Sequence, residues 1–225
     1  MPYRAAMVVV LLPLSSLTVC ANDWPQFRGP TGQGISDAAH APLTWSESEN
    51  LLWKIALPGR GWWTPVLATG KAYLNTCREK SAASEQESAA PQAAAAGDPQ
   101  LEVVQSISLS LLQIDLADGT IERDIPLFLI ETPDPIHGRN SFASPTPVLA
   151  DGHCYCDFGA LGVACVSVAD GSVRWRHQSV IQHNVGPGSS PAVVDDLLIL
   201  TRDGADVQYI EAVDRLTGDV VWKRP

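Results

Sequence analysis

The fold is decided by residues 212–222, which read AVDRLTGDVVW. Weaker copies of this pattern lie upstream, and they are found by aligning Gly218 with Gly171 and Gly119. The steps between these glycines are 52 residues (119 to 171) and 47 residues (171 to 218). A self-similar period of this length is typical of propellers and repeat arrays.

Each copy belongs to a unit of four short strands. A unit opens on a Ser/Thr-Pro step, where proline suits the first residue of a strand because no ladder donor is lost. Glycine in the turn before the last strand supplies the positive φ that a compact hairpin needs. The sequence therefore predicts an all-β fold, a partial β-propeller of about three four-stranded antiparallel blades. The predicted blades are residues 64–125, 146–176 and 191–223, with one orphan outer strand at 51–56.

One tryptophan recurs in each unit. Trp175 and Trp222 each stand four residues after the turn glycine, on the outermost strand, and Trp53 marks the orphan strand. A recurrent aromatic is most simply an inter-blade packing device, and a ring-stacking ligand platform is the alternative. In the first unit Arg123 takes the tryptophan position. We therefore expect that seam to be less apolar.

The stretch ending at Trp222 resembles the tryptophan-docking motif of pyrroloquinoline-quinone-type propellers, Ala-x-Asp-x-x-Thr-Gly-x-x-x-Trp. All five defining positions match, and they are Ala212, Asp214, Thr217, Gly218 and Trp222. Residues 23–30 are similar to the initial segment of secreted bacterial propellers that are grouped with BamB-like outer-membrane assembly propellers. The resemblance covers about residues 22–225 without 78–106. It implies a fold and no particular activity, because one fold hosts many functions.

Quinoprotein dehydrogenases of this type hold their cofactor with a disulfide of adjacent cysteines, a tryptophan platform and a calcium ion ligated by carboxylate and amide groups. This sequence has no adjacent cysteine pair and no cluster of Asp, Glu and Asn at calcium-loop spacing. We therefore expect no metal and no cofactor in this segment, and pyrroloquinoline quinone is implied by the resemblance alone. No nucleophile elbow or zinc-hydrolase spacing occurs either. A fragment of a quinone-dependent oxidoreductase is the alternative function.

The N-terminus has the pattern of an export signal at residues 1–21. Arg4 supplies the positive region, residues 5–17 are apolar, and small residues follow before the predicted cleavage. The apolar stretch is too short to span a bilayer, so we expect an extracytoplasmic protein, periplasmic or secreted, that is not transmembrane after cleavage. Lipid anchoring through Cys20 is less favoured, because Val19 is bulkier than the residue usual before a lipidated cysteine.

Charge excludes one class of partner. The formal net charge is −10 with only 15 Lys and Arg residues, and none of them form a run. Binding to a phosphate backbone needs clustered cations, so we expect no nucleic acid. Open blade edges predict self-association instead.

Four cysteines follow the predicted cleavage. Cys154 and Cys156 alternate along one strand and so share a face. Cys165 lies on the next strand, near enough to be a cross-strand partner if the hairpin closes. Buried thiols acting as small hydrophobes are the favoured interpretation, because a Cys-x-Cys metal site lacks a second ligand pair at metal-binding spacing.

Residues 78–106 are rich in Ala, Ser, Glu and Gln, with few large apolar side chains to offset ordering entropy. They are predicted to form a disordered insert. This insert and the loops 59–64, 137–144 and 183–190 follow second or fourth strands, so they share one face of the predicted propeller, whereas the other face has tight turns.

Long loops on a rigid scaffold are where binding residues concentrate. The candidate ligand-binding residues are Arg60, His137, Arg139, Asn140, Ser141, His183 and Asn184. Turn capping by the same residues is the structural alternative.

The predicted function is an exported, non-catalytic binding or scaffold propeller for a protein or a cell-envelope polymer. An anionic polymer would bind through Arg60 and Arg139. A protein would use Trp62, Trp63 or Phe142 as an anchor.

Overall fold

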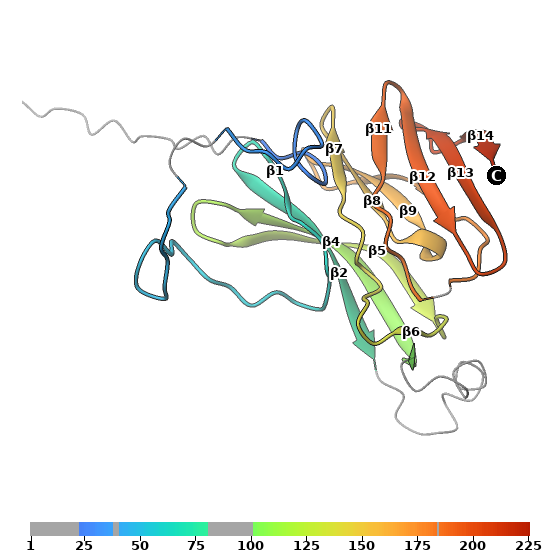
Figure 1. The fold of residues 1–225 in the computed structure, drawn as a ribbon, viewed down its shortest axis with the longest axis horizontal. Coiled ribbons are helices and arrows are strands. Elements are labelled where there is room, and N and C mark those ends of the chain that lie inside the picture. The colour runs from blue at the N-terminus through green and yellow to red at the C-terminus, as the bar shows by residue number, and fades with distance from the viewer. Residues whose placement is uncertain (1–22, 38–40, 81–100, 184) are drawn as a thin grey trace, which may run out of the picture.

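The computed structural model describes residues 23–37, 41–80, 101–183 and 185–225. Within them, three four-stranded antiparallel sheets follow one another along the chain as adjacent blades (Figure 1). The predicted export signal, Cys20 and Asn184 lie outside the described residues. No helix in the described ranges is long and apolar enough to cross a membrane.

Each sheet keeps its strands in chain order, as a propeller blade does. The first blade contains β1 (Val66–Ala68), β2 (Lys71–Lys80), β4 (Ser106–Asp115) and β5 (Ile121–Glu131). The second contains β7 (Val148–Ala150), β8 (His153–Asp157), β9 (Val163–Ser167) and β10 (Val173–His177). The third contains β11 (Ala192–Val194), β12 (Leu197–Asp203), β13 (Gln208–Asp214) and β14 (Val220–Arg224). The predicted all-β partial propeller is confirmed.

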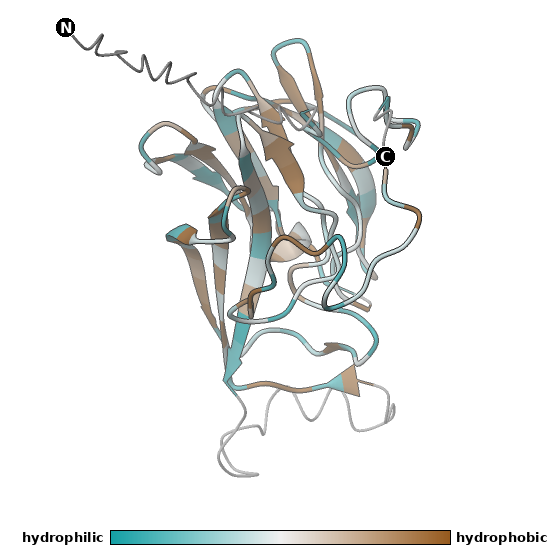
Figure 2. Ribbon diagram, turned by 90° about the vertical axis from the view of Figure 1, so that its left-hand side faces the viewer, coloured by the Kyte–Doolittle hydropathy of each residue, from teal (hydrophilic) through white to brown (hydrophobic). Residues whose placement is uncertain are grey.

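Two shorter elements lie among the connections. β3 (Leu101–Glu102) pairs with β6 (Ile136–His137), so the segment before β4 is held against the loop that leads into the second blade. A 3-10 turn, η1 (Gly159–Leu161), joins β8 to β9. Along the strands, hydrophobic and hydrophilic residues alternate (Figure 2), and β5 alternates between half-buried and exposed positions over most of its length.

The predicted orphan strand at 51–56 is wrong, because these residues form no strand. No neighbouring strand in the described part of the chain pairs with them. Their packing is nevertheless that of an outer strand, since Trp53 and Ile55 lie on the apolar face of the first blade. The indole nitrogen of Trp53 donates to the carbonyl oxygen of Leu116 at 2.8 Å.

The predicted insert at 78–106 is too long. β2 continues to Lys80 and β4 begins at Ser106, and these two residues are paired in register. Continuous pairing with β4 satisfies the backbone of the last three residues of β2, so polar composition does not prevent a strand there. Residues 81–100 lie outside the described residues, and their predicted disorder stays a prediction.

The core lies between the blades. Ile107 and Leu109 of β4 pack with Cys156 of β8 in the first seam. Tyr155 of the same strand packs with Leu198 in the second seam, because side chains alternate across the sheet. The second blade therefore gives one face to each neighbouring blade. A third cluster, which includes Leu74 and Leu112, lies on the other face of the first blade.

The four described cysteines are buried and free. Cys154 and Cys156 share a face as expected, and their sulfur atoms are 3.9 Å apart. Cys165 is not their cross-strand partner, because it is paired in register with Tyr155 and lies in the other seam. The interpretation as buried thiols is confirmed. Burial raises the pKa of Cys77 and of Cys165 to about 12.

The tryptophans dock on the turn glycines of the following blade. Trp53 lies so close to Gly119 that a Cβ there would come within 2.7 Å of the indole. Trp175 lies against Gly218 in the same way, since a Cβ on Gly218 would come within 2.8 Å of the indole. The indole nitrogen of Trp175 donates to the carbonyl oxygen of Arg215 at 3.0 Å. Both glycines have φ near +80°. The packing interpretation of these tryptophans is confirmed at both seams.

A bulge precedes the docking position in every blade. Pairing shifts by one residue between Gln113 and Ile114, between Val173 and Trp175, and between Ala212 and Val213. A bulge re-aims the side chain that follows it. The shift accounts for the four-residue spacing from glycine to tryptophan that the sequence shows.

The third blade has one face without a covering blade among the described residues. Ile210 is 45% exposed and Val221 is 55% exposed, on neighbouring strands. The self-association expected from such a face stays a prediction.

Candidate functional site

The inner ends of the three blades are tied together by side-chain hydroxyls. The amide of Thr64 donates to Oγ1 of Thr146 at 3.1 Å, and the amide of Thr146 donates to Oγ of Ser190 at 3.0 Å. All three residues stand immediately before the proline that opens a blade. The same step that starts each first strand therefore also joins it to the next blade.

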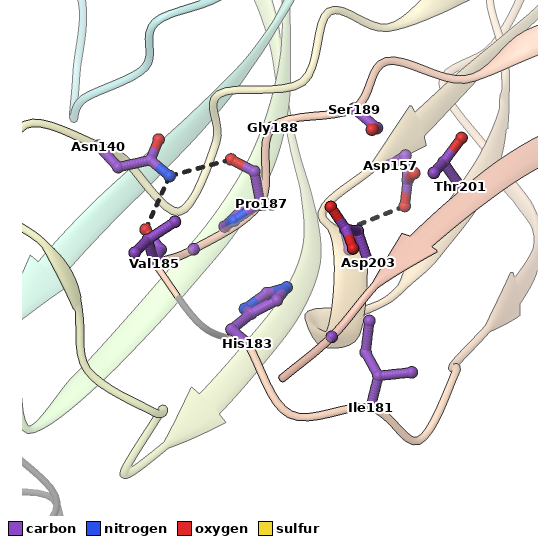
Figure 3. Close-up of a pocket in the computed structure, with 13 residues that line it drawn as sticks. Asn140, Asp157, Ile181, His183, Val185, Pro187, Gly188, Ser189, Thr201 and Asp203 are labelled. Atoms are coloured by element: carbon purple, nitrogen blue, oxygen red, sulfur yellow. Dashed lines mark hydrogen bonds between the residues drawn. The ribbon is translucent and has the colours of Figure 1, made fainter. Parts of the chain in front are cut away.

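Asn140 fixes two of the predicted binding loops to each other. Its Nδ2 donates to the carbonyl oxygens of Val185 at 2.9 Å and Pro187 at 3.2 Å (Figure 3). Its Oδ1 accepts from the amide of Ser141 at 2.8 Å and from the hydroxyl of Ser144 at 2.6 Å. Both donor hydrogens and both acceptor sites of this amide are used. Residues 137–144 and 185–190 are consequently held together as one surface.

The N-terminal segment runs along the inner edges of two blades. Trp24 and Leu67 exchange two backbone hydrogen bonds of 2.8 and 2.9 Å, and the amide of Leu149 donates to the carbonyl of Pro25 at 2.7 Å. These bonds satisfy edge groups of β1 and β7. They also bring Phe27 to the loops that surround the blade ends.

These segments enclose a hollow of about 480 Å³, which we call the axial hollow. Its lining consists of Phe27, Trp62, Thr64, Arg139, Asn140, Ser144, Thr146, Gly188, Ser189 and Ser190. No lining residue is acidic. Phe27 is 50% exposed and Trp62 is 63% exposed. Within the described part of the chain, no carboxylate is paired with the guanidinium of Arg139. The lining therefore offers aromatic surface, hydrogen-bonding groups and one cation.

A second hollow of about 330 Å³, which we call the side hollow, adjoins the axial hollow. The two share Asn140, Gly188 and Ser189. Figure 3 shows Asp157, His183, Thr201 and Asp203 around the side hollow. Its two carboxylates make it chemically unlike the axial hollow.

His183 is a buried hydrogen-bond acceptor. Its Nε2 accepts from the amide of Ala160 at 2.9 Å, which fixes the 3-10 turn. Burial lowers the pKa of His183 to about 4, with a further contribution from the positive charge of Arg202. The imidazole is therefore neutral at pH 7, and its Nε2 is already engaged.

A buried charged cluster lies beside the side hollow. Arg202 donates from Nη1 to both carboxylate oxygens of Asp157, at 3.1 and 2.9 Å, and from Nε to Glu211 at 3.0 Å. All three side chains are almost fully buried. Burial raises the pKa of Asp157 even though Arg202 favours its charged form. The hydroxyl of Ser179 joins both Arg202 and Glu211, so the cluster holds the connector between the second and third blades.

The structure brings some of the predicted binding residues together. Arg139 and Asn140 line the axial hollow, and Asn140 and His183 line the side hollow. Ser141 is buried, and its hydroxyl donates to the carbonyl of Arg60 at 3.4 Å. His137 accepts the amide hydrogen of Arg139 at its Nδ1, at 3.0 Å. These two residues shape the loops that carry Arg139 and Asn140.

Arg60 lines neither hollow. Its guanidinium is paired with Glu79 at 3.0 Å and with Glu102 at 2.9 Å. Its positive charge is therefore balanced within the chain. Phe142 is 1% exposed in the first seam, so the expectation that it could anchor a protein is wrong.

The sequence pattern did not predict that Phe27, or the side-chain hydroxyls that join the inner ends of the blades, belong to the site. The repeated Ser/Thr before each blade-opening proline was a usable signal for Thr64, Thr146 and Ser190, because the same polar residue recurs once per unit. Phe27 had no such signal. Its position depends on the backbone pairing of Trp24 with Leu67, across 43 residues of sequence (24 to 67).

The lining does not fit a calcium-quinone assembly. Calcium takes carboxylate and carbonyl oxygens, and the axial hollow contains no carboxylate. The described cysteines are in or beside the seams rather than in the hollow. No group of three or more His, Cys, Asp or Glu that could hold a metal occurs in the described ranges.

No protein family and no curated protein matches the sequence. Among solved structures, the chain is similar to a europium-containing methanol dehydrogenase, with 15% identity over 75% of this chain and 25% of that chain, and a TM-score of 0.42. It is similar to the quinohemoprotein alcohol dehydrogenase ADHIIG of Pseudomonas putida HK5, with 14% identity over 76% and 21% of the two chains and a TM-score of 0.44. For BamB of Moraxella catarrhalis, identity is 16% over 54% and 33%, with a TM-score of 0.33.

The chain thus spans between about a fifth and a third of the length of these proteins. The likeness concerns the fold alone. The three sheets and the docked tryptophans show the fold from this chain's own residues, which is three adjacent blades of a β-propeller.

Proposed function

We propose that this chain is an exported, non-catalytic propeller module that binds a protein or cell-envelope ligand through the face carrying its long loops. The observation that carries the proposal is the axial hollow, in which loops from three blades and the N-terminal segment converge. A concave site with a few convergent polar groups is where ligands bind by default. The predicted export signal supports an extracytoplasmic ligand.

The side chains of the hollow suit binding better than chemistry. The hydroxyls of Thr146 and Ser190 already accept backbone amides, so they hold the blades together. An activated serine needs a base within hydrogen-bond reach. His183, which lines the adjoining side hollow, uses its Nε2 to accept from Ala160. Stacking and hydrogen bonding are what this arrangement offers.

Rigidity favours the same function. Asn140 makes four hydrogen bonds, of which two join the two loops and two lie within its own loop, and the Arg202 cluster holds the connector between the second and third blades. A surface that is already ordered loses little conformational entropy when a ligand arrives. The exposed rings of Phe27 and Trp62 therefore stand on a prepared framework.

The test is photo-crosslinking in the producing cell. A photoreactive phenylalanine analogue is placed at Trp62 on the loop face, and in a matched protein at Asp118, an exposed turn position of the opposite face. We expect covalent adducts from position 62 and none from position 118. Equal adducts from both positions, or none from position 62, would overturn the proposal.

The alternative function has its own readout. A fragment of a quinone-dependent oxidoreductase would change the absorption spectrum of added pyrroloquinoline quinone in the presence of calcium. We expect no such change, because the hollow lacks the carboxylates that would hold the ion. A saturable spectral change would move the assignment to an oxidoreductase.

A further inference from the structure

We propose that the axial hollow binds a carboxylate-bearing sugar of an acidic polysaccharide, with the carboxylate on Arg139 and the sugar ring against Phe27 and Trp62. This inference rests on the proposed binding function and names its ligand class. Three features support it: the charge of the lining, the exposed aromatic rings, and the strand edges that already bond to the N-terminal segment.

The charge distribution favours an anionic ligand in the axial hollow. The chain carries a net charge of −10, so most of its surface repels anions. The wall of the axial hollow has no acidic residue and carries Arg139, which has no carboxylate partner among the described residues. Arg28 places a further positive charge at Phe27, with its guanidinium 5.5 Å from the centre of that ring. A guanidinium binds a carboxylate through two parallel charge-assisted hydrogen bonds.

The structure distinguishes Arg139 from Arg60. Both are loop-face cations, but Arg60 already binds Glu79 and Glu102. An incoming carboxylate at Arg60 would have to displace one of these partners or sit beside two negative charges. At Arg139 it meets neither. Of these two arginines, the one without a carboxylate partner among the described residues therefore lines the hollow.

The rest of the lining suits a polyol. Phe27 and Trp62 leave about half or more of their surfaces in water, and such rings pack against the apolar faces of sugars. The hydroxyl of Ser189 is both a donor and an acceptor, as sugar hydroxyls are. The volume of about 480 Å³ is that of a small-molecule site.

An extended peptide fits less well. Peptides often bind by adding a strand to an open sheet edge. The inner edges of β1 and β7 next to the hollow already bond to Trp24 and Pro25. Backbone pairing is therefore already used at two of the three inner edges, those of β1 and β7.

The experiment is titration calorimetry of the full chain with trigalacturonate and with maltotriose. We expect trigalacturonate to bind at least tenfold more tightly, and Arg139→Gln to weaken it by about tenfold or more, since bonds between charged groups are the strong ones. Arg174→Gln is the matched control, because it removes an exposed arginine outside the hollow. It should leave both affinities unchanged.

The aromatic contribution is tested in the same way. Trp62→Leu and Phe27→Leu are each expected to weaken the binding of trigalacturonate by about fivefold or more, because each removes an aromatic ring that packs against the sugar. Trp45→Leu is the control, because Trp45 is 74% exposed and lines no part of the hollow.

Three results would overturn the inference: equal affinity for the two sugars, full affinity of the Arg139→Gln protein, or binding of hexaglutamate peptide in place of trigalacturonate. The two experiments together distinguish a wrong ligand class from a wrong binding function. If position 62 crosslinks to a protein and no sugar binds, only the ligand class is wrong. If position 62 gives no adduct and no sugar binds, both are wrong.

Discussion

The guanidinium of Arg123 donates to the carbonyl oxygen of Val168 at 2.9 Å, and this is the contact that tryptophan makes at the other seams. Trp53 donates to Leu116 and Trp175 donates to Arg215. Each acceptor stands three residues before its turn glycine. Arg123 also donates to Ala169 and to the side chain of Gln113. The docking position of this seam is polar, and an arginine plane takes the place of the indole. The expectation that the seam as a whole is less apolar is wrong, because its cluster of buried apolar side chains is larger than that of the second seam.

Because Arg123 makes the same contact as the docked tryptophans, its replacement by alanine should cost more stability than its replacement by tryptophan. Arg123→Ala removes donors to two carbonyls and should lower the free energy of unfolding by about 1–3 kcal/mol. Arg123→Trp should change it by about 1 kcal/mol or less, because the same slot holds an indole at both other seams. Urea denaturation of the two variants gives both values. Equal losses would show that the slot is specific for arginine.

The docking glycines should be intolerant of a side chain. Gly218→Ala places a Cβ within 2.8 Å of Trp175 at φ +81°, and we expect a loss of about 2–5 kcal/mol from backbone strain and overpacking together. Gly70→Ala is the matched control, because Gly70 has φ +75° and open space around its Cα. It should cost about 1–2 kcal/mol, the backbone part alone. Thermal melts that shift equally would remove the role assigned to Trp175.

The Arg202 cluster predicts a pH-dependent loss. Arg202→Met leaves Asp157 buried without its cation, whereas Glu211 keeps Lys223 at 3.2 Å, and the change should cost about 3–5 kcal/mol at pH 7. Burial already raises the pKa of Asp157, and loss of the guanidinium raises it further. Protonation at lower pH then relieves the variant, so its deficit should shrink between pH 7 and pH 5. Chemical denaturation at both values measures this, with Arg174→Met as the exposed control. A deficit that is constant with pH would contradict the explanation.

The buried His183 predicts that acid destabilises the wild-type chain, whereas acid should relieve the Arg202→Met variant. Its pKa is lowered from 6.5 to about 4 in the folded chain. The unfolded chain therefore binds this proton first, and the stability that depends on the neutral ring is complete above pH 6.5 and lost as pH falls toward 4. The full difference is about 3 kcal/mol. His183→Gln should flatten the pH dependence of unfolding between pH 7 and pH 4.5.

The control for this measurement is His153→Gln. His153 lies at the start of β8, with its Nδ1 at 3.0 Å from the carbonyl oxygen of Asp151. We expect the His153 variant to keep the wild-type slope. A wild-type slope in the His183 variant as well would assign the acid sensitivity to other groups.

The fold was largely predictable from local pattern. Turn glycines with positive φ, prolines that open strands and a tryptophan once per unit are local requirements of a four-stranded blade. They recur in sequence because every blade solves the same packing problem. The failures at 51–56 and 78–106 have a common cause. Whether a segment is a strand depends on the partner beside it, and Lys80 has Ser106 whereas Trp53 has none in the described ranges.

The sequence by itself determined the repeat, the all-β class and the face on which the long loops gather. Only the tertiary structure decided which loop residues are available to a ligand. Arg60 and Arg139 look alike in sequence, and Glu79 and Glu102 neutralise one of them through contacts set by β2 and by the β3–β6 pair. His183 looks like a binding residue and is buried as an acceptor for Ala160. Phe27 reaches the hollow through the pairing of Trp24 with Leu67. Charge balance, burial and long-range pairing are properties of neighbours in space, and a local pattern does not contain them.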